Sequence, residues 1–366
     1  MLILGIDTSC DETAAAVVRD ETTVLSNVIS SQGIHHEYGG VVPELASRAH
    51  LSLLLPAIES ALHQASCEPD GLDALAVTYG PGLAGCLLIG LTTVKSIALA
   101  MDKPLVGVNH IEGHLFAGRL ADGELDPPFI ALVVSGGHTQ LVHVERWGTY
   151  HILGNTRDDA AGEAFDKVAR LMRVGYPGGP VIDRLSRDGD PGFLDFPRTY
   201  LDPEGFEFSF SGLKNAIRMY LSKQSEAEID RDLAHIAAAF QEAVVDVLVD
   251  KSMAAAASVG VDAVLITGGV ACNGRLRERM TERGAELGFK VVYPPPILCT
   301  DNGAMIAAAG AYRFRQGQRD GLSLSVQPRA RLSAYNGGLL NGQSGQSGQS
   351  GKVRSGGQSS NRSSGP

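Results

Sequence analysis

Short hydrophobic runs separated by polar, glycine-rich turns recur along the chain in the same order, once in each half. The first half opens with an apolar run at residues 2–6, the polar turn Asp7-Thr-Ser9 and a second apolar run at 14–18. The second half opens in the same way over residues 129–142. Runs of this length between turn residues predict β-strands. Each half is therefore predicted to begin with two strands joined by a polar turn.

A second pattern follows in each half: a strand, a glycine-rich segment, a helix and another strand. It spans residues 74–108 in the first half and residues 263–293 in the second. Alternating strands and helices predict an α/β protein. Because the pattern is duplicated, we expect two lobes with a cleft between them, where ligands bind at the converging strand ends.

The length of the chain, 366 residues, exceeds the usual size of one domain. We expect an N-terminal lobe at residues 1–120 and a C-terminal lobe at residues 121–330, with a helical insertion at about 155–223. Residues 336–366 are dominated by Gly, Ser and Gln and have almost nothing to bury. This tail is predicted to be disordered.

Composition narrows the functional classes. The formal net charge of −10 argues against broad, non-specific binding of nucleic acid, although arginines at 170–173 and 275–279 could supply local basic patches. The five cysteines are odd in number and widely spaced, with no Cys-x-x-Cys pair. We therefore expect reduced thiols in a cytoplasmic protein. The apolar start ends at Asp7, too early for a secretory or membrane-spanning segment, so no membrane partner is expected.

A candidate metal site begins with His110 and His114, which are four residues apart and would share one face of a helix. The duplication points to a third ligand. The strand before His110 corresponds to the strand at residues 290–293, and the segment after that strand carries Asp301 at the start of a small-residue helix. If the two halves face each other, the three side chains meet across the cleft. Two imidazoles and one carboxylate suit iron(II), zinc or manganese.

The pair of histidines first suggests a zinc protease, which would carry the motif His-Glu-x-x-His. Here Glu112 comes two residues after His110, about 200° around a helix, so it is predicted to point away from the metal face and to be a poor general base. A serine hydrolase is also disfavoured, because no Gly-x-Ser-x-Gly elbow surrounds Ser209 or Ser211.

Other motifs are suited to a nucleotide. The turns at residues 7–9 and 135–139 could cradle phosphate oxygens with backbone N–H groups, and residues 268–274 could form a purine pocket before a helix. Asp166 and Asp183 could accept hydrogen bonds from ribose hydroxyls. Each motif alone could equally be an ordinary turn, cap or surface charge.

Taken together, the motifs resemble one family. His110-x-x-x-His114 and the segments 135–141, 208–214, 267–273 and 300–303 resemble the TsaD family, the tRNA N6-adenosine threonylcarbamoyltransferases formerly described as O-sialoglycoprotein endopeptidases. The resemblance extends from Met1 to about Ala330. It implies a duplicated fold like that of actin, sugar kinases and heat-shock chaperones (ASKHA), with two lobes around a cleft.

The resemblance also implies a reaction. The threonylcarbamoyl group of threonylcarbamoyl-AMP would be transferred to N6 of the adenosine 3′ of the anticodon, in tRNAs that read codons starting with A. The implied partners are tRNA, the paralogue TsaB and the ATPase TsaE, with TsaC supplying the donor. The implied metal is iron(II), with zinc as the alternative, held by His110, His114 and Asp301. The implied substrate contacts are Val133, Val134, Ser135, Gly136 and Gly137 for the phosphate, Asp166, Gly179 and Asp183 for the ribose, and Asn273 for the adenine.

Such a transfer needs alignment and polarisation more than a covalent nucleophile, because AMP is a good leaving group and the amine is a weak nucleophile. We expect the metal to hold the threonylcarbamoyl group, and Asp11 or Glu12 to assist removal of the proton. Two other functions fit the same fold. One is a small-molecule kinase or ATPase, and the other is a metal-binding scaffold without catalysis.

Overall fold

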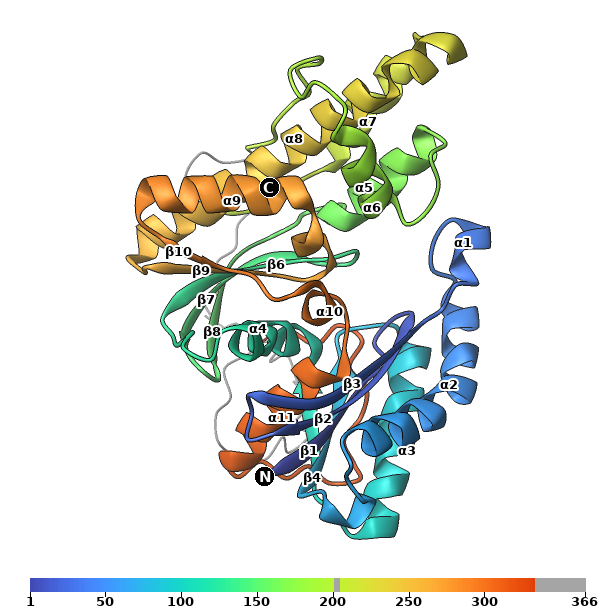
Figure 1. The fold of residues 1–366 in the computed structure, drawn as a ribbon, viewed down its shortest axis with the longest axis vertical. Helices are drawn as coiled ribbons and strands as arrows, with labels where there is room; N and C mark the ends of the chain where they lie inside the picture. The colour runs from blue at the N-terminus through green and yellow to red at the C-terminus, as the bar shows by residue number, and fades with distance from the viewer. Residues whose placement is uncertain (201–204, 333–366) are drawn as a thin grey trace, which may run out of the picture.

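The structure is a computed structural model that describes residues 1–200 and 205–332. Two five-stranded sheets form the centres of its two lobes (Figure 1). The expected tail at 336–366 lies outside the described residues. Figure 1 shows the lobe that contains the N-terminus below the lobe that carries most of the later helices.

The first sheet has the strand order β3-β2-β1-β4-β5. Its first three strands pair antiparallel, and the last two run parallel to β1. The strands are β1 (Leu2–Asp7), β2 (Glu12–Arg19), β3 (Thr23–Ser31), β4 (Ala74–Gly80) and β5 (Leu105–Asn109).

The second sheet repeats this plan in the order β8-β7-β6-β9-β10. Again three antiparallel strands are followed by two that run parallel to the first of them. The strands are β6 (Phe129–Val134), β7 (Thr139–Arg146), β8 (Thr149–Asn155), β9 (Ala263–Thr267) and β10 (Lys290–Val292). Each strand of one sheet has a counterpart in the other, so the predicted duplication is confirmed and the fold is a duplicated actin-like fold.

Helices cover both faces of the two sheets (Figure 1). The first half contributes α1 (His35–Tyr38), α2 (Pro43–Gln64), η1 (Pro69–Gly71), α3 (Ala84–Met101) and α4 (His110–Ala121). The second half contributes α5 (Ala161–Leu171), α6 (Gly178–Ser186), α7 (Ser211–Leu221), α8 (Glu226–Val259), η2 (Gly269–Cys272), α9 (Gly274–Leu287), α10 (Pro296–Cys299) and α11 (Gly303–Arg315).

The last helix, α11, packs on the first sheet although it follows the second. Its alanines share one buried core with side chains of β1, β2, β4 and β5. The backbones come very close: a Cβ on Gly5 would lie 2.3 Å from the backbone nitrogen of Ala307, and one on Gly303 would lie 2.6 Å from that of Ala16. We therefore propose that the first lobe includes α11 in addition to residues 1–120.

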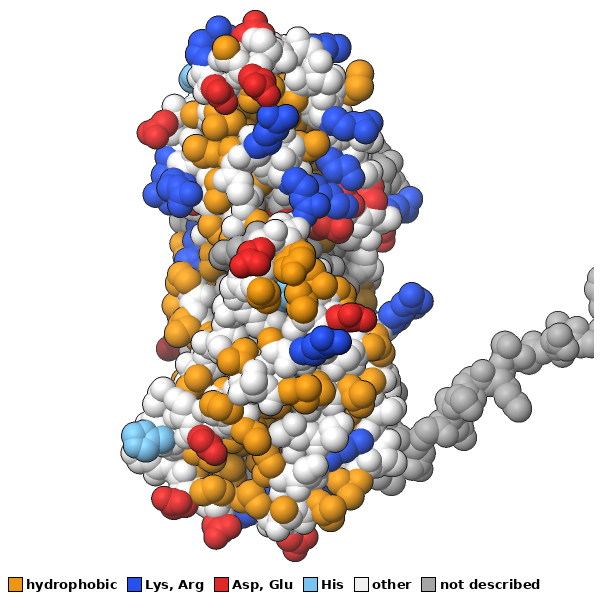
Figure 2. Space-filling model, turned by 90° about the vertical axis from the view of Figure 1, so that its right-hand side faces the viewer, with side chains coloured by type: hydrophobic (Ala, Val, Ile, Leu, Met, Phe, Trp, Pro, Cys, Tyr) orange, Lys and Arg blue, Asp and Glu red, His pale blue; other side chains and the backbone are white. Residues whose placement is uncertain are grey.

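One helix among the described residues, α3, is long and apolar enough to cross a membrane by length and composition, with a mean hydropathy of 1.7. It packs against β4 and α2, and 33% of it is buried. Leu88 and Leu99 of α3 remain exposed, as do Leu51 and Leu55 of α2. The side of the molecule that lies on the right in Figure 1 faces the viewer in Figure 2, which shows hydrophobic side chains gathered over its lower half. The helices α2 and α3 therefore present an apolar surface.

Candidate functional site

The histidine pair is placed by the start of α4. The side chain of Asn109, at the end of β5, accepts a hydrogen bond from the backbone N–H of Ile111 at 2.9 Å and caps the helix. The cap makes His110 the first residue of α4, and His114 lies one turn later on the same face. Both imidazoles are almost completely buried, with 4% and 0% of each residue exposed.

The third ligand comes from the segment between α10 and α11. Asn302 caps α11 by accepting a hydrogen bond from the backbone N–H of Met305 at 3.0 Å, which leaves Asp301 just before the helix. One carboxylate oxygen of Asp301 lies 3.4 Å from Nε2 of His110 and 3.3 Å from Nε2 of His114. The structure thus brings together the three side chains that the duplication predicted.

These three ligands fit a divalent cation. Two donor atoms each about 2.1 Å from an ion, at angles of about 90–110°, lie about 3.0–3.4 Å apart, which matches both imidazole–carboxylate distances. All three ligand atoms lie within 4.8 Å of one another. Neither ring nitrogen of His114 has a hydrogen-bond partner among the described residues, although both are buried. Buried polar atoms without partners are costly, and a bound cation would satisfy one of them.

Asp7 lies behind His110. Its Oδ2 atom is 3.4 Å from Nδ1 of His110, on the opposite edge of the ring from Asp301. Asp7 is completely buried and also accepts a hydrogen bond from the Ser9 hydroxyl at 3.2 Å. A carboxylate behind a histidine ligand fixes the orientation of the ring. The turn at residues 7–9 therefore supports His110 of the candidate metal site.

The charge state of each of the three side chains depends on the other two. Burial alone would raise the pKa of Asp301, but the two imidazoles hold it well below its usual range. Burial opposes protonation of His110, yet the carboxylates of Asp301 and Asp7 raise its pKa well above the ordinary value. Burial lowers the pKa of His114. Anionic Asp301 and neutral His114 are the forms that bind a metal, whereas His110 must give up a proton.

Glu112 points away from the metal ligands, as its position in the sequence predicted. It is completely buried, accepts a hydrogen bond from the Tyr150 hydroxyl at 2.8 Å and pairs with the Arg313 guanidinium. Glu112 therefore links α4 to α11 and to the second sheet.

His110 and Asp301 of the candidate metal site border a cleft of about 1240 Å³ between the lobes. The expected site residues that line it are Asp11, Glu12, His110, Ser135, Gly136, Gly137, Asp166, Gly179, Asp183, Asn273 and Asp301. Val133 and Val134 do not line it, because they lie in the completely buried strand β6. His114 is likewise buried behind the cleft wall.

The loop at Ser135–Gly137 lies against the start of α5. The backbone N–H of Gly162 donates to the carbonyl of Ser135 at 3.2 Å, and a Cβ at Gly162 would lie 2.6 Å from that carbonyl oxygen. Within the described part of the chain, a Cβ built on Gly136 or Gly137 would meet no heavy atom within 4 Å apart from its chain neighbours, so this side of the loop is open.

Three polar side chains of the second lobe already make hydrogen bonds within the protein. Asp166 accepts from the backbone N–H of Gly178 at 2.7 Å, and Asp183 accepts from that of Gly274 at 3.0 Å. The side-chain oxygen of Asn273 caps α9, and its amide donates to Gln241 at 2.7 Å. Each keeps unused hydrogen-bonding capacity toward the cleft.

The turn that carries Asp11 and Glu12 is fixed by His50, whose ring contacts the Thr13 hydroxyl at 2.7 Å and the Cys10 carbonyl at 3.0 Å. Burial, together with the nearby carboxylates of Asp301 and Asp11, raises the pKa of Glu12 well above its ordinary value.

Several cleft residues were not predicted. His138 lies with its ring 6.2 Å from that of His110, and burial lowers its pKa to about 4. Arg170, Arg184 and Arg187 also line the cleft. His138 belongs to a motif visible in the sequence, and Arg170 belongs to one of the predicted basic patches, but the sequence did not predict that Arg184 and Arg187 would line the cleft.

Comparisons with known proteins agree with this arrangement. A family model described as TsaD, tRNA N6-adenosine threonylcarbamoyltransferase, matches residues 23–308. The protein of that name from Syntrophus aciditrophicus (strain SB) is 52% identical over 330 residues, which cover 90% of this chain and 97% of that protein. The one from Clostridium perfringens (strain SM101) is 50% identical over 332 residues, covering 90% and 98%.

Solved structures share the fold at low identity. HypF from T. kodakarensis superposes with a TM-score of 0.59 at 16% identity, over 86% of this chain and 48% of that one, so the chain spans about half the length of HypF. The activator of 2-hydroxyisocaproyl-CoA dehydratase from Clostridium difficile superposes with a TM-score of 0.50 at 12% identity, over 87% and 99%.

Proposed function

The chain belongs to the TsaD family of tRNA N6-adenosine threonylcarbamoyltransferases and is a transferase that modifies tRNA, and we propose that the reaction takes place at the His110, His114 and Asp301 cluster in its inter-lobe cleft. The relatives' name supports this activity over a kinase or a non-catalytic scaffold.

The proposed donor is threonylcarbamoyl-AMP, and the proposed acceptor is N6 of the adenosine 3′ of the anticodon in tRNAs that read codons starting with A. The single observation that carries the site is that a buried cluster of two imidazoles and one carboxylate opens into a cleft large enough for a nucleotide. Ser135–Gly137 would hold the phosphate through backbone N–H groups. Asp166, Asp183 and Gly179 would contact the ribose, and Asn273 the adenine.

A divalent ion bound to the three side chains would act as a Lewis acid toward the carbamoyl carbonyl. We propose iron(II), because the donor set of two nitrogens and one oxygen suits it and the family resemblance favours it, with zinc as the alternative. His110, His114 and Asp301 hold this position rigidly, since two helix caps and the carboxylate of Asp7 fix them.

Asp11 and Glu12 are the proposed proton acceptors. Both carboxyl groups line the same cleft as His110 and Asp301. A base that accepts the amine proton works best with a pKa near the operating pH. The raised pKa of Glu12 supports this assignment.

The tRNA is proposed to approach over the arginines of α5 and α6. Arg170, Arg184 and Arg187 line the cleft, and Figure 2 shows Lys and Arg side chains gathered over the upper lobe of this face. Basic side chains at the cleft would bind phosphates despite the net charge of −10. The exposed leucines of α2 and α3 offer a separate apolar surface for the proposed partner TsaB. TsaE and TsaC complete the proposed set of partners in the cytoplasm.

The test reconstitutes tRNA modification with a donor-forming enzyme and the partner proteins. Rates for the wild type are compared with those for His110→Ala and Asp301→Ala. His151→Ala is the control, because His151 is exposed on strand β8 and does not line the cleft. We expect both cluster variants to lose activity while folded, and the control to keep it. If both variants modify tRNA as fast as the wild type, the proposed metal-centred reaction is wrong.

A further inference from the structure

A closed ring of hydrogen bonds joins two of the side chains that are proposed to contact the nucleoside. Asp183 and Asn273 both line the cleft, and the backbone N–H of Gly274, the residue after Asn273, donates to the Asp183 carboxylate at 3.0 Å. A second path between them runs through Ser186 of α6 and Gln241 of α8, neither of which lines the cleft. The ring therefore ties α6, α8 and the start of α9 together.

Each bond along the second path has a fixed direction. The Ser186 hydroxyl donates its only proton to the backbone carbonyl of Asp183 at 3.0 Å, so its oxygen can only accept another bond. Gln241 therefore turns its Nε2 atom to Ser186, at 2.7 Å, and its Oε1 atom to Asn273. The Asn273 amide donates to that Oε1 atom at 2.7 Å.

The other end of the path is also fixed by the backbone. The side-chain oxygen of Asn273 accepts a hydrogen bond from the backbone N–H of Leu276 at 2.9 Å and so caps α9. A backbone carbonyl can only accept and a backbone N–H can only donate, so neither amide can turn over without placing two donors or two acceptors face to face. The Asn273 amide is therefore held in one orientation, and the second N–H of its NH₂ group has no printed use within the described chain.

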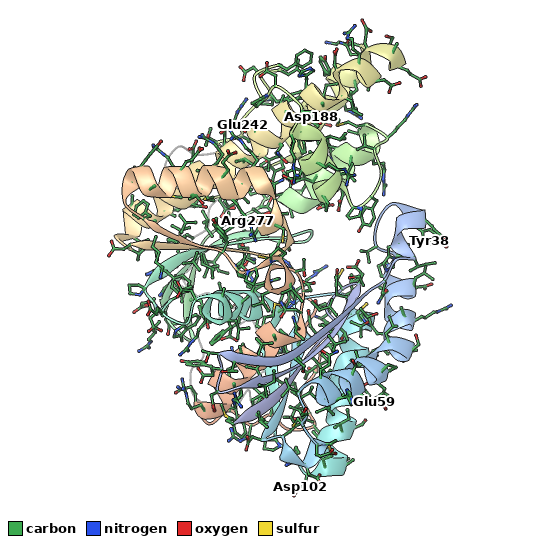
Figure 3. All side chains as sticks on the ribbon, viewed as in Figure 1. Tyr38, Glu59, Asp102, Asp188, Glu242 and Arg277 are labelled. Atoms are coloured by element: carbon green, nitrogen blue, oxygen red, sulfur yellow. The ribbon has the colours of Figure 1, made fainter. Side chains whose placement is uncertain are left out.

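Burial makes this path costly to break. Gln241 is 4% exposed, and Asn273 and Ser186 are each 8% exposed. Removing the Gln241 amide would leave a buried N–H of Asn273 without its acceptor. The helix α8 is held against α9 at the next residue, because Glu242 accepts hydrogen bonds from the Arg275 guanidinium at 2.7 and 2.8 Å. Figure 3 labels Glu242 where α8 lies beside α9.

We propose that Gln241 is a positioning residue for the nucleotide: it holds the Asn273 amide so that the second N–H of that amide meets the adenine ring. The identity of the ligand rests on the proposed function, which places the adenine of the donor at Asn273. Gln241 does not reach the cleft, so it acts through Asn273. A purine ring nitrogen such as N7 of adenine is an acceptor, which is the complement of this N–H.

The ring also fixes the separation of the two nucleoside contacts. Gly274 holds the side chain of Asp183, and Ser186 holds its backbone carbonyl. Adenine and ribose are covalently joined, so contacts that are already correctly spaced favour binding by pre-organisation. The metal ligands are built instead on α4 and on the segment before α11. Loss of Gln241 should therefore weaken nucleotide binding and leave metal binding unchanged.

The test measures the binding of AMP, the nucleotide part of the proposed donor, to the full-length protein by isothermal titration calorimetry. Gln241→Leu should weaken AMP binding about tenfold, the equivalent of one hydrogen bond. Ser186→Ala leaves the bond between Gln241 and Asn273 in place and should weaken AMP binding by a smaller factor, about threefold. Ser252→Ala is the matched control and should bind AMP like the wild type, because Ser252 is also buried on α8 but donates to the Leu248 carbonyl of the same helix.

A double-mutant cycle tests whether Gln241 acts through Asn273. Asn273→Ser keeps an oxygen that can cap α9 but removes the amide N–H, so it should weaken AMP binding at least as much as Gln241→Leu. Adding Gln241→Leu to Asn273→Ser should then have little further effect. The proposal is overturned if the two losses add, if Gln241→Leu binds AMP like the wild type, or if the wild type does not bind AMP. If Gln241→Leu does not fold, Ser186→Ala decides, and an unchanged AMP affinity in that variant overturns the proposal.

Two further measurements separate positioning from a general loss of structure. Zinc affinity, measured by competitive titration, should be the same in Gln241→Leu as in the wild type, whereas a general loss of structure would lower it. In the reconstituted transfer reaction, Gln241→Leu should raise KM for the donor with kcat nearly unchanged, and the opposite pattern would contradict a role in ground-state positioning. If the AMP affinities follow the expected order but the wild type modifies no tRNA, the proposed function fails and the positioning role of Gln241 stands.

Discussion

The buried ion pair of Glu112 and Arg313 tests whether Glu112 stabilises the fold without taking part in catalysis. Glu112 is completely buried, and Arg313 is 7% exposed. Replacing Glu112 with Leu leaves a guanidinium buried beside an apolar side chain, which costs about 3–5 kcal/mol of folding free energy. For about 330 described residues, an unfolding entropy of about 2.1 cal/mol/K per residue converts this loss into a fall in Tm of roughly 4–7 °C.

The companion variants isolate the ion pair. Arg313→Met leaves the carboxylate buried and should cost a similar amount. The double variant Glu112→Leu/Arg313→Met removes both charges, so we expect it to be more stable than either single variant, with a coupling energy of at least about 2 kcal/mol. The remaining loss would come from Tyr150, whose hydroxyl donates to Glu112, and from Gln318, whose side-chain oxygen accepts from Arg313.

The assay combines thermal unfolding with the reconstituted transfer reaction at a temperature well below every transition. All three variants should keep transfer rates close to that of the wild type, because Glu112 does not line the cleft. The structural role of Glu112 is refuted if Glu112→Leu loses transfer while its Tm is unchanged. That result would restore Glu112 as a catalytic base.

Three further predictions concern the metal ligands. Asp7→Asn removes the carboxylate behind His110 and should weaken zinc binding, measured by competitive titration, about 10–100-fold; an unchanged affinity would show that Asp7 does not position the ring. Because the pKa of His110 is raised in the metal-free protein, calorimetry in buffers of different ionisation enthalpy should show about one proton released per ion at pH 7, and affinity should fall as the pH is lowered. Gly303→Ala places a Cβ 2.6 Å from the backbone nitrogen of Ala16, so it should lower the free energy of unfolding by about 1–3 kcal/mol and weaken metal binding through Asp301. The control Gly123→Ala, whose Cβ meets no described atom within 4 Å, should change neither quantity.

Much of this structure could be predicted because the same order of apolar runs and polar turns occurs in both halves of the sequence. Repeated strand and turn patterns predicted two matching lobes, and the match between them pointed to Asp301 as the candidate third ligand. Helical geometry was enough to predict that Glu112 points away from His110 and His114 and cannot serve as the base of a zinc protease. These inferences depend only on the order of elements and on fixed helical angles.

Other features could not be predicted because they depend on packing between distant segments. The return of α11 to the first sheet depends on close backbone contacts at Gly5 and Gly303, which have no local signature in the sequence. Val133 and Val134 were expected to contact the phosphate together with Ser135–Gly137. Only Ser135–Gly137 form the loop at the cleft, whereas Val133 and Val134 pair with β7 inside the sheet and are buried.

The position of α4 accounts for the location of the metal ligands between the lobes. Phe116 of α4 packs into the core around α11, and Ile111 and Leu115 pack into the core of the second sheet. Both lobes therefore hold the same helix, and a rotation of one lobe about α4 would leave His110 and His114 in place. Contacts farther out, such as that between the Arg170 guanidinium and the Gly39 carbonyl, would open or close with such a rotation. A rotation of this kind would therefore change the outer contacts of the cleft more than the arrangement of His110 and His114.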